Sequence, residues 1–95
     1  GAMRRAARVD GNQSQLAAAF RSLGCSVLSL APLGKGVPDL LVAINGITWL
    51  VEVKMPNGKE NELQVEFAIT WKGCRAVVRD LQGVELTVKT MKFMA

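Results

Sequence analysis

Apolar positions along this 95-residue chain follow two spacings, one typical of helices and one typical of strands. Leu16 and Phe20 recur at a helical interval and predict a helix over residues 11–23. Asp10 stands at the N-cap position of this helix, and Gln13 follows three residues later, which is the spacing of a capping box. The first predicted element is therefore a helix with one apolar face.

An Asn45-Gly46 pair separates two apolar runs in the middle of the sequence. Both central residues of a type I′ turn need positive φ angles, so Asn-Gly between such runs is a strong hairpin signal. We therefore predict a hairpin with strands over residues 38–44 and 47–54. If Asn45 and Gly46 are the two loop residues, the numbers of directly opposed residues sum to 91.

Three further segments complete the central part of the chain. Residues 25–30 predict a short strand, and residues 31–38 predict a loop because they contain two prolines and two glycines. A second helix is expected over residues 61–73, where Gly73 ends it, and residues 74–79 predict another strand.

The second predicted helix carries both a cap and an apolar stripe. Asn61 can cap its first turn, and Gln64 sits at the third helical position, which repeats the capping-box pattern. Leu63, Phe67 and Trp71 recur every four residues and form the stripe.

Residues 80–95 fit two kinds of element. A helix is indicated by Leu81, Val84, Val88 and Met91, whereas a strand is indicated by Val84, Leu86 and Val88. We favour a short helix. The element order is then α-β-β-β-α-β with a helix after it, which predicts an α/β fold with a mixed β-sheet flanked by helices.

Composition is that of a globular protein, with 49% apolar residues. We expect one domain over residues 3–95, with Gly1-Ala2 before Met3 as an expression scar. The longest uncharged apolar run, residues 40–51, contains the turn and is too short to span a bilayer. The N-terminus has no apolar signal-peptide core, so we expect a cytoplasmic protein.

The residue types that are missing narrow the possible chemistry. The chain has no histidine and no tyrosine, and its two cysteines do not form a metal-binding motif. Carboxylates, lysine, hydroxyls and a bound metal therefore remain for catalysis. The net charge of +4 indicates a polyanionic partner. Arg4, Arg5 and Arg8 form a basic arm that is either a solvated end or a contact to that partner.

Two acids and one amine gather at the open end of the predicted hairpin. Asp39 faces Glu52 in the predicted register, and Lys54 points to the same side of the sheet. Opposed like charges destabilise a hairpin, but two neighbouring carboxylates can bind a divalent cation. The Val53 carbonyl could act as a further ligand. Alternatively, Asp39 caps a turn and Glu52 pairs with Lys54 on an exposed face.

These residues also match a known family. The segments Gly36-Val37-Pro38-Asp39 and Val51-Glu52-Val53-Lys54 resemble the signature of PD-(D/E)XK nucleases. More narrowly, the chain resembles a stand-alone, phage-like virus-type replication-repair nuclease (VRR-NUC) domain. The resemblance implies a restriction-endonuclease-like fold, a Mg²⁺ or Mn²⁺ cofactor, Asp39 and Glu52 as metal ligands, and Lys54 as the catalytic lysine.

Two glutamines are candidates for supporting roles at this site. Many members of the superfamily carry a glutamate on the first helix, where this chain offers Gln13, with Asn12 as the second choice. Gln64 resembles the glutamine of the family's Leu-Thr-x-x-Gln segment, although Asn61 replaces the threonine. Each glutamine can act in catalysis or serve only the local structure, Gln64 as a capping-box side chain.

The resemblance implies hydrolysis of phosphodiester bonds in DNA by an endonuclease. Stand-alone phage members resemble Holliday-junction resolvases, so branched DNA is the expected substrate, a homodimer the expected assembly, and a bacterial or phage-infected host cell the expected location. A flap-cutting or restriction-like nuclease is one alternative. The second alternative is a basic module that binds nucleic acid without catalysis. Its DNA binding would not change when a chelator is added.

Overall fold

This computed structural model describes residues 12–95. The expectations for the Gly1-Ala2 pair and for the arm formed by Arg4, Arg5 and Arg8 fall on residues 1–11 and lie outside the described part. The predicted capping box of Asp10 and Gln13 is wrong, because Asn12 is the N-cap residue of the first helix and Gln13 is its first helical residue. The elements are α1 (Gln13–Ser22), β1 (Ser26–Ser29), the short 3₁₀ turn η1 (Ala31–Leu33), β2 (Leu40–Ile44), β3 (Ile47–Val53), α2 (Glu62–Thr70), β4 (Arg75–Val78) and α3 (Leu81–Met94).

The four strands form one mixed sheet in the order β1-β2-β3-β4. Strands β1, β2 and β3 pair antiparallel, whereas β3 and β4 pair parallel, with α2 in the connection between them. The predicted register is confirmed, because Ile44 pairs with Ile47 and Val42 with Trp49. Asn45 and Gly46 have φ angles of 54° and 80°, as a type I′ turn requires.

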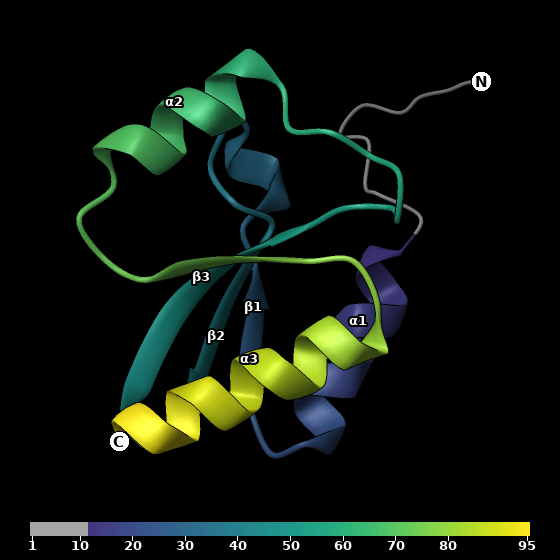
Figure 1. Ribbon diagram of the computed structural model, residues 1–95, viewed down its shortest axis with the longest axis vertical. Coiled ribbons are helices and arrows are strands. Elements are labelled where there is room, and N and C mark those ends of the chain that lie inside the picture. The colour runs from purple at the N-terminus through teal and green to yellow at the C-terminus, as the bar shows by residue number, and fades with distance from the viewer. Residues whose placement is uncertain (1–11) are drawn as a thin grey trace.

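Helices α1 and α3 cover one face of the sheet, as Figure 1 shows. The core between these layers is made of apolar side chains from both helices and all four strands: Leu16, Ala17, Phe20, Cys25, Val27, Leu40, Val42, Val51, Val53, Val78, Val84, Val88 and Met91. Among residues 12–95, no helix is long and apolar enough to cross a membrane.

Residues 81–94 form a helix of 14 residues, longer than the short helix we expected. The helix begins where the Asp80 side chain accepts a hydrogen bond from the Gly83 amide. One side of this helix is buried and carries Val84, Val88 and Met91. The helical alternative is therefore confirmed and the strand alternative is wrong.

Helix α2 lies on the other side of the sheet from α1 and α3 (Figure 1). Its capping box is confirmed, because the Asn61 side chain accepts from the Gln64 amide and the Gln64 side chain accepts from the Asn61 amide. The helix ends earlier than predicted, since Trp71 is extended. None of its own residues is fully buried, and the Leu63 side chain is 54% exposed. The expected apolar stripe is therefore only partly covered.

Candidate active site

Asp39 and Glu52 lie at the open end of the hairpin, on the sheet face turned to α2. Strand alternation places Val51 and Val53 in the core and Glu52 on the opposite face. Asp39 directly precedes β2, and its Oδ2 accepts a hydrogen bond of 2.9 Å from the backbone N–H of Val53. The Asp39 carboxylate is thus held against the end of β3, one residue beyond Glu52.

The Glu52 side chain is almost completely buried, with 1% exposure. Its Oε2 accepts a hydrogen bond of 3.0 Å from Gln64 Nε2, so the first turn of α2 holds this oxygen. Its Oε1 is buried and has no hydrogen-bond partner among the described residues. A buried carboxylate oxygen without a donor is costly unless a cation or a bound water meets it.

Burial, above all, and the neighbouring Asp39 carboxyl group raise the pKa of Glu52 from its ordinary value of 4.5 to about 8. The positive charges of Lys54 and Arg75 act in the other direction but are the smaller influence. Two carboxyl groups this close resist holding two negative charges, so in the absence of a cation Glu52 keeps a proton at neutral pH.

Lys54 follows β3 directly, and both of its backbone polar groups are fixed. Its N–H donates to the Val78 carbonyl, which extends the parallel pairing with β4. Its carbonyl accepts a hydrogen bond of 3.1 Å from Asn12 Nδ2, which also donates to the Arg79 carbonyl at 2.8 Å. Asn12 therefore ties the start of α1 to the ends of both strands. Sequence reasoning did not find this role, although Asn12 was the second choice for a site residue on the first helix.

Gln13 is the first residue of α1 and follows Asn12, so its backbone is held at the same end of the sheet. Its side chain is 6% exposed, and its Oε1 is buried without a hydrogen-bond partner among the described residues. Gln13 is thus a second buried oxygen that is open to a ligand or a water. No hydrogen bond joins the Gln13 side chain to Glu52 among residues 12–95, so the catalytic role of Gln13 stays a prediction.

Comparison with solved structures adds an independent observation. One matching chain, described as "VRR_NUC domain", shares 30% sequence identity and superimposes with a TM-score of 0.65. The match covers 81% of this chain and 89% of that chain. The chain belongs to the VRR-NUC family. No protein-family model matches the sequence, and no match was found among curated proteins.

The VRR-NUC relationship confirms the predicted fold and makes this chain a nuclease domain of the PD-(D/E)XK type. Within this VRR-NUC domain, Gln64 donates a hydrogen bond to Glu52, and the charges of Asp39 and Lys54 both act on the Glu52 carboxyl group. The Val53 amide takes part through Asp39, while the role of its carbonyl as a ligand stays a prediction.

Two arginines of the VRR-NUC domain hold the segment between Lys54 and α2. Arg79 Nη1 donates to the carbonyls of Met55 and Gly58, which shapes the loop after Lys54. Arg75 forms an ion pair with Glu60. Both guanidinium groups are therefore engaged within the protein.

Gly36 fixes the position of α2 over the VRR-NUC site. Its φ angle is +81°, and a Cβ at this position would lie 2.3 Å from the Leu63 carbonyl oxygen. We expect Gly36→Ala to displace the first turn of α2, to destabilise the protein by about 1–3 kcal/mol, and to weaken cleavage through loss of the Gln64 contact to Glu52. Thermal melts and cleavage rates measure both effects.

Gly46→Ala is the matched control for this substitution. Gly46 has a similar φ of +80°, but no atom lies within 4 Å of the position of its Cβ. It lies at the far end of the hairpin from Glu52. This variant should lose about 1 kcal/mol of stability and keep its cleavage rate. Equal cleavage rates for the two alanine variants would contradict the positioning role of Gly36.

Proposed function

We propose that this VRR-NUC domain is a Mg²⁺- or Mn²⁺-dependent endonuclease that hydrolyses phosphodiester bonds in branched DNA. The observation that carries the proposal is the half-buried Asp39 carboxyl group beside the buried Glu52, one oxygen of which has no hydrogen-bond partner among the described residues. Such a pair destabilises the empty protein and becomes favourable when a divalent cation binds.

The residues present fit a hard divalent cation. Carboxylate and carbonyl oxygens are its preferred ligands, and they are offered by Asp39, Glu52 and the Val53 carbonyl. The amide oxygen of Gln13, which has no partner among the described residues, is a further candidate. Residues 12–95 contain no cluster of three or more His, Cys, Asp or Glu side chains, so water together with amide or backbone oxygens would complete the shell. A bound cation would lower the pKa of a water ligand and offset charge on the phosphate.

The protein's own residues divide the remaining tasks. Gln64 holds Glu52 Oε2, which fixes the direction of the free Oε1. The Val53 amide holds Asp39 Oδ2 in the same way. Lys54 supplies an ammonium group that can orient the attacking water and neutralise the phosphate being cut. The burial of Glu52 keeps bulk water from weakening these interactions.

Net charge and exposed apolar surface support a homodimer that acts on branched DNA. The charge of +4 suits a polyanion. Large apolar side chains away from the catalytic carboxylates stay exposed on the α2 side of the sheet: Leu28, Val65 and Ile69. Apolar patches of this kind often mark contacts between proteins. A two-fold dimer would present two equivalent sites to the two symmetric strands of a four-way junction.

The test is cleavage of three labelled substrates, a four-way junction, a flap and a linear duplex, each with Mg²⁺, Mn²⁺ or chelator. We expect metal-dependent cuts in the junction, and a mass of two chains by light scattering. Cleavage of the linear duplex alone would refute the branched-DNA claim. Salt-dependent binding without any cleavage, unaffected by chelator, would identify a non-catalytic nucleic-acid-binding module instead.

A further inference from the structure

The loop before Asp39 holds a lysine in an unusual backbone conformation. Gly34, Lys35 and Gly36 have consecutive positive φ angles of 59°, 56° and 81°. For lysine the left-handed region costs about 1 kcal/mol or more, and such strain gathers at ligand-binding segments. The conformation is fixed because Gly36 packs directly against the Leu63 backbone of α2.

A cleft lies between this loop and α2. It has a volume of about 390 Å³ and is lined by Lys35, Leu63, Glu66, Phe67 and Thr70. This volume lies at the small end of the range for ligand pockets, roughly 300–1,000 Å³. The cleft is therefore suited to a ligand of modest size, and we call it the Lys35 cleft.

The walls of the Lys35 cleft combine a cation with an aromatic ring. The one ion pair within residues 12–95 joins Arg75 and Glu60, so the Lys35 ammonium is available to an anion. The Phe67 ring is half-buried and stacks on Trp71, with ring centres 5.3 Å apart and planes inclined by 18°. A positive side chain beside a rigid aromatic platform is the combination that binds single-stranded nucleic acid.

Both walls of the Lys35 cleft belong to elements that hold the catalytic carboxylates. The loop runs from Lys35 directly into Asp39, and α2 contacts Glu52 through Gln64. We infer that the cleft holds one unpaired nucleotide of the DNA strand next to the scissile bond, with its phosphate on Lys35 and its base on Phe67. This inference rests on the proposed nuclease function and adds the feature of branched DNA that the enzyme recognises.

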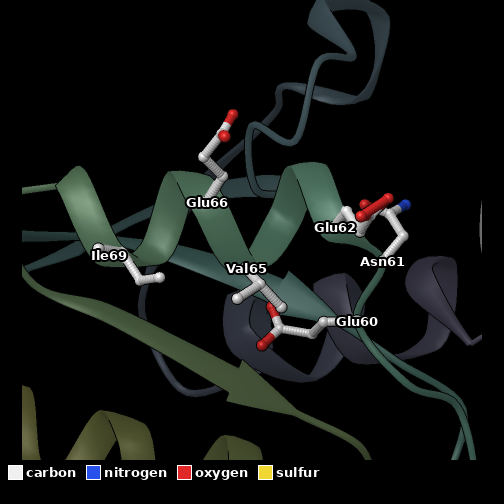
Figure 2. A pocket seen from close by; sticks show the side chains of 6 residues that line it. All are labelled: Glu60, Asn61, Glu62, Val65, Glu66 and Ile69. Atoms are coloured by element: carbon white, nitrogen blue, oxygen red, sulfur yellow. The ribbon is translucent and has the colours of Figure 1, made fainter.

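The adjacent side of α2 is unsuitable for a polyanion. Figure 2 shows a second hollow there, around Val65, with glutamates at 60, 62 and 66 on its rim. Glu66 borders both hollows. In the Lys35 cleft its negative charge would repel a second phosphate. Its carboxylate can instead accept a hydrogen bond from the amino group of a base. DNA is therefore expected to approach α2 from the Lys35 side. A paired, stacked base cannot reach Phe67, which favours strands with an unpaired nucleotide.

The test compares DNA binding by the full chain in chelator, where no cleavage occurs. The probes are a flap substrate with 2-aminopurine at its first unpaired position and a fully paired nicked duplex of the same sequence. Lys35→Gln should weaken binding of the flap at least about fivefold, with a smaller effect on binding of the duplex. It should also lower the slope of the log binding constant against log salt concentration by about 0.7. Phe67→Leu should retain the fold but lose the quenching of 2-aminopurine that stacking causes.

Lys89→Gln is the control, because Lys89 lies on α3 at the opposite face of the sheet. It should leave the preference for the flap unchanged. Equal weakening of flap and duplex by Lys35→Gln, or unchanged 2-aminopurine fluorescence in Phe67→Leu, would overturn the inference. Failure of the proposed function looks different, since the Lys35 effects would then persist in a protein that cuts no DNA with Mg²⁺ or Mn²⁺.

Discussion

Replacing Asp39 by asparagine should abolish DNA cleavage and leave the fold intact. The asparagine oxygen can still accept the hydrogen bond from the Val53 amide, but the negative charge that attracts a divalent cation is gone. Loss of groups that merely support a metal ligand typically costs 10–100-fold in activity, so loss of a ligand should cost more than about 100-fold. Cleavage of a labelled four-way junction with Mg²⁺ measures this loss.

Asp39→Ala separates the electrostatic role of Asp39 from its structural one. Alanine removes the repulsion with Glu52, but it also leaves the Val53 N–H without its acceptor, which costs about 1–3 kcal/mol. We therefore expect both variants to lose cleavage and only the alanine variant to lose thermal stability. Lys54→Ala should also be inactive while still folded. Cleavage by Asp39→Asn at the parent rate would refute the assignment of Asp39.

Glu52→Gln should abolish cleavage and stabilise the metal-free protein at alkaline pH. The pKa of Glu52 is about 8 in the folded protein, above its ordinary value of 4.5, so the folded state holds a proton that the unfolded state has released. The contribution of Glu52 to the stability of the parent is therefore greatest below pH 4.5 and is lost as the pH rises to about 8. The glutamine variant avoids this loss, which is on the order of 2–4 kcal/mol.

Thermal melts between pH 4 and pH 9 in chelator measure the effect. At pH 8.5 the Tm of Glu52→Gln should exceed that of the parent by upwards of roughly 8 °C, and the two should converge at pH 4. Added Mg²⁺ or Mn²⁺ should raise the Tm of the parent and have little effect on the variant, because the cation replaces the proton on Glu52. Parallel Tm profiles of the two proteins across this pH range would contradict the burial-driven pKa.

The hairpin could be predicted from sequence because its determinants are local. Asn45-Gly46 selects one turn type, and the turn fixes the register that brings Asp39 close to Glu52. The capping box at Asn61 and Gln64 is equally local. The contact from Gln64 to Glu52 was not predicted, because a cap and a site residue share the same sequence signal and here the side chain serves both roles.

The features that sequence reasoning missed depend on contacts between distant residues. Asn12 reaches carbonyls 42 and 67 positions away, and no periodicity reports such a contact. The spacing of Val84 and Val88 suits a helix, while the alternation in the same segment suits a strand, so packing against the core decided between them. An apolar stripe on α2 likewise does not reveal how much of it the sheet will cover.

The double duty of Gln64 links helix order to reactivity. The same side chain that closes the first turn of α2 also grips a carboxylate oxygen of the sheet, and α2 has no fully buried residue to keep it in place. Fraying of this one turn would release the grip while the four strands remain assembled. DNA cleavage should thus be lost at a temperature well below the one at which the sheet unfolds.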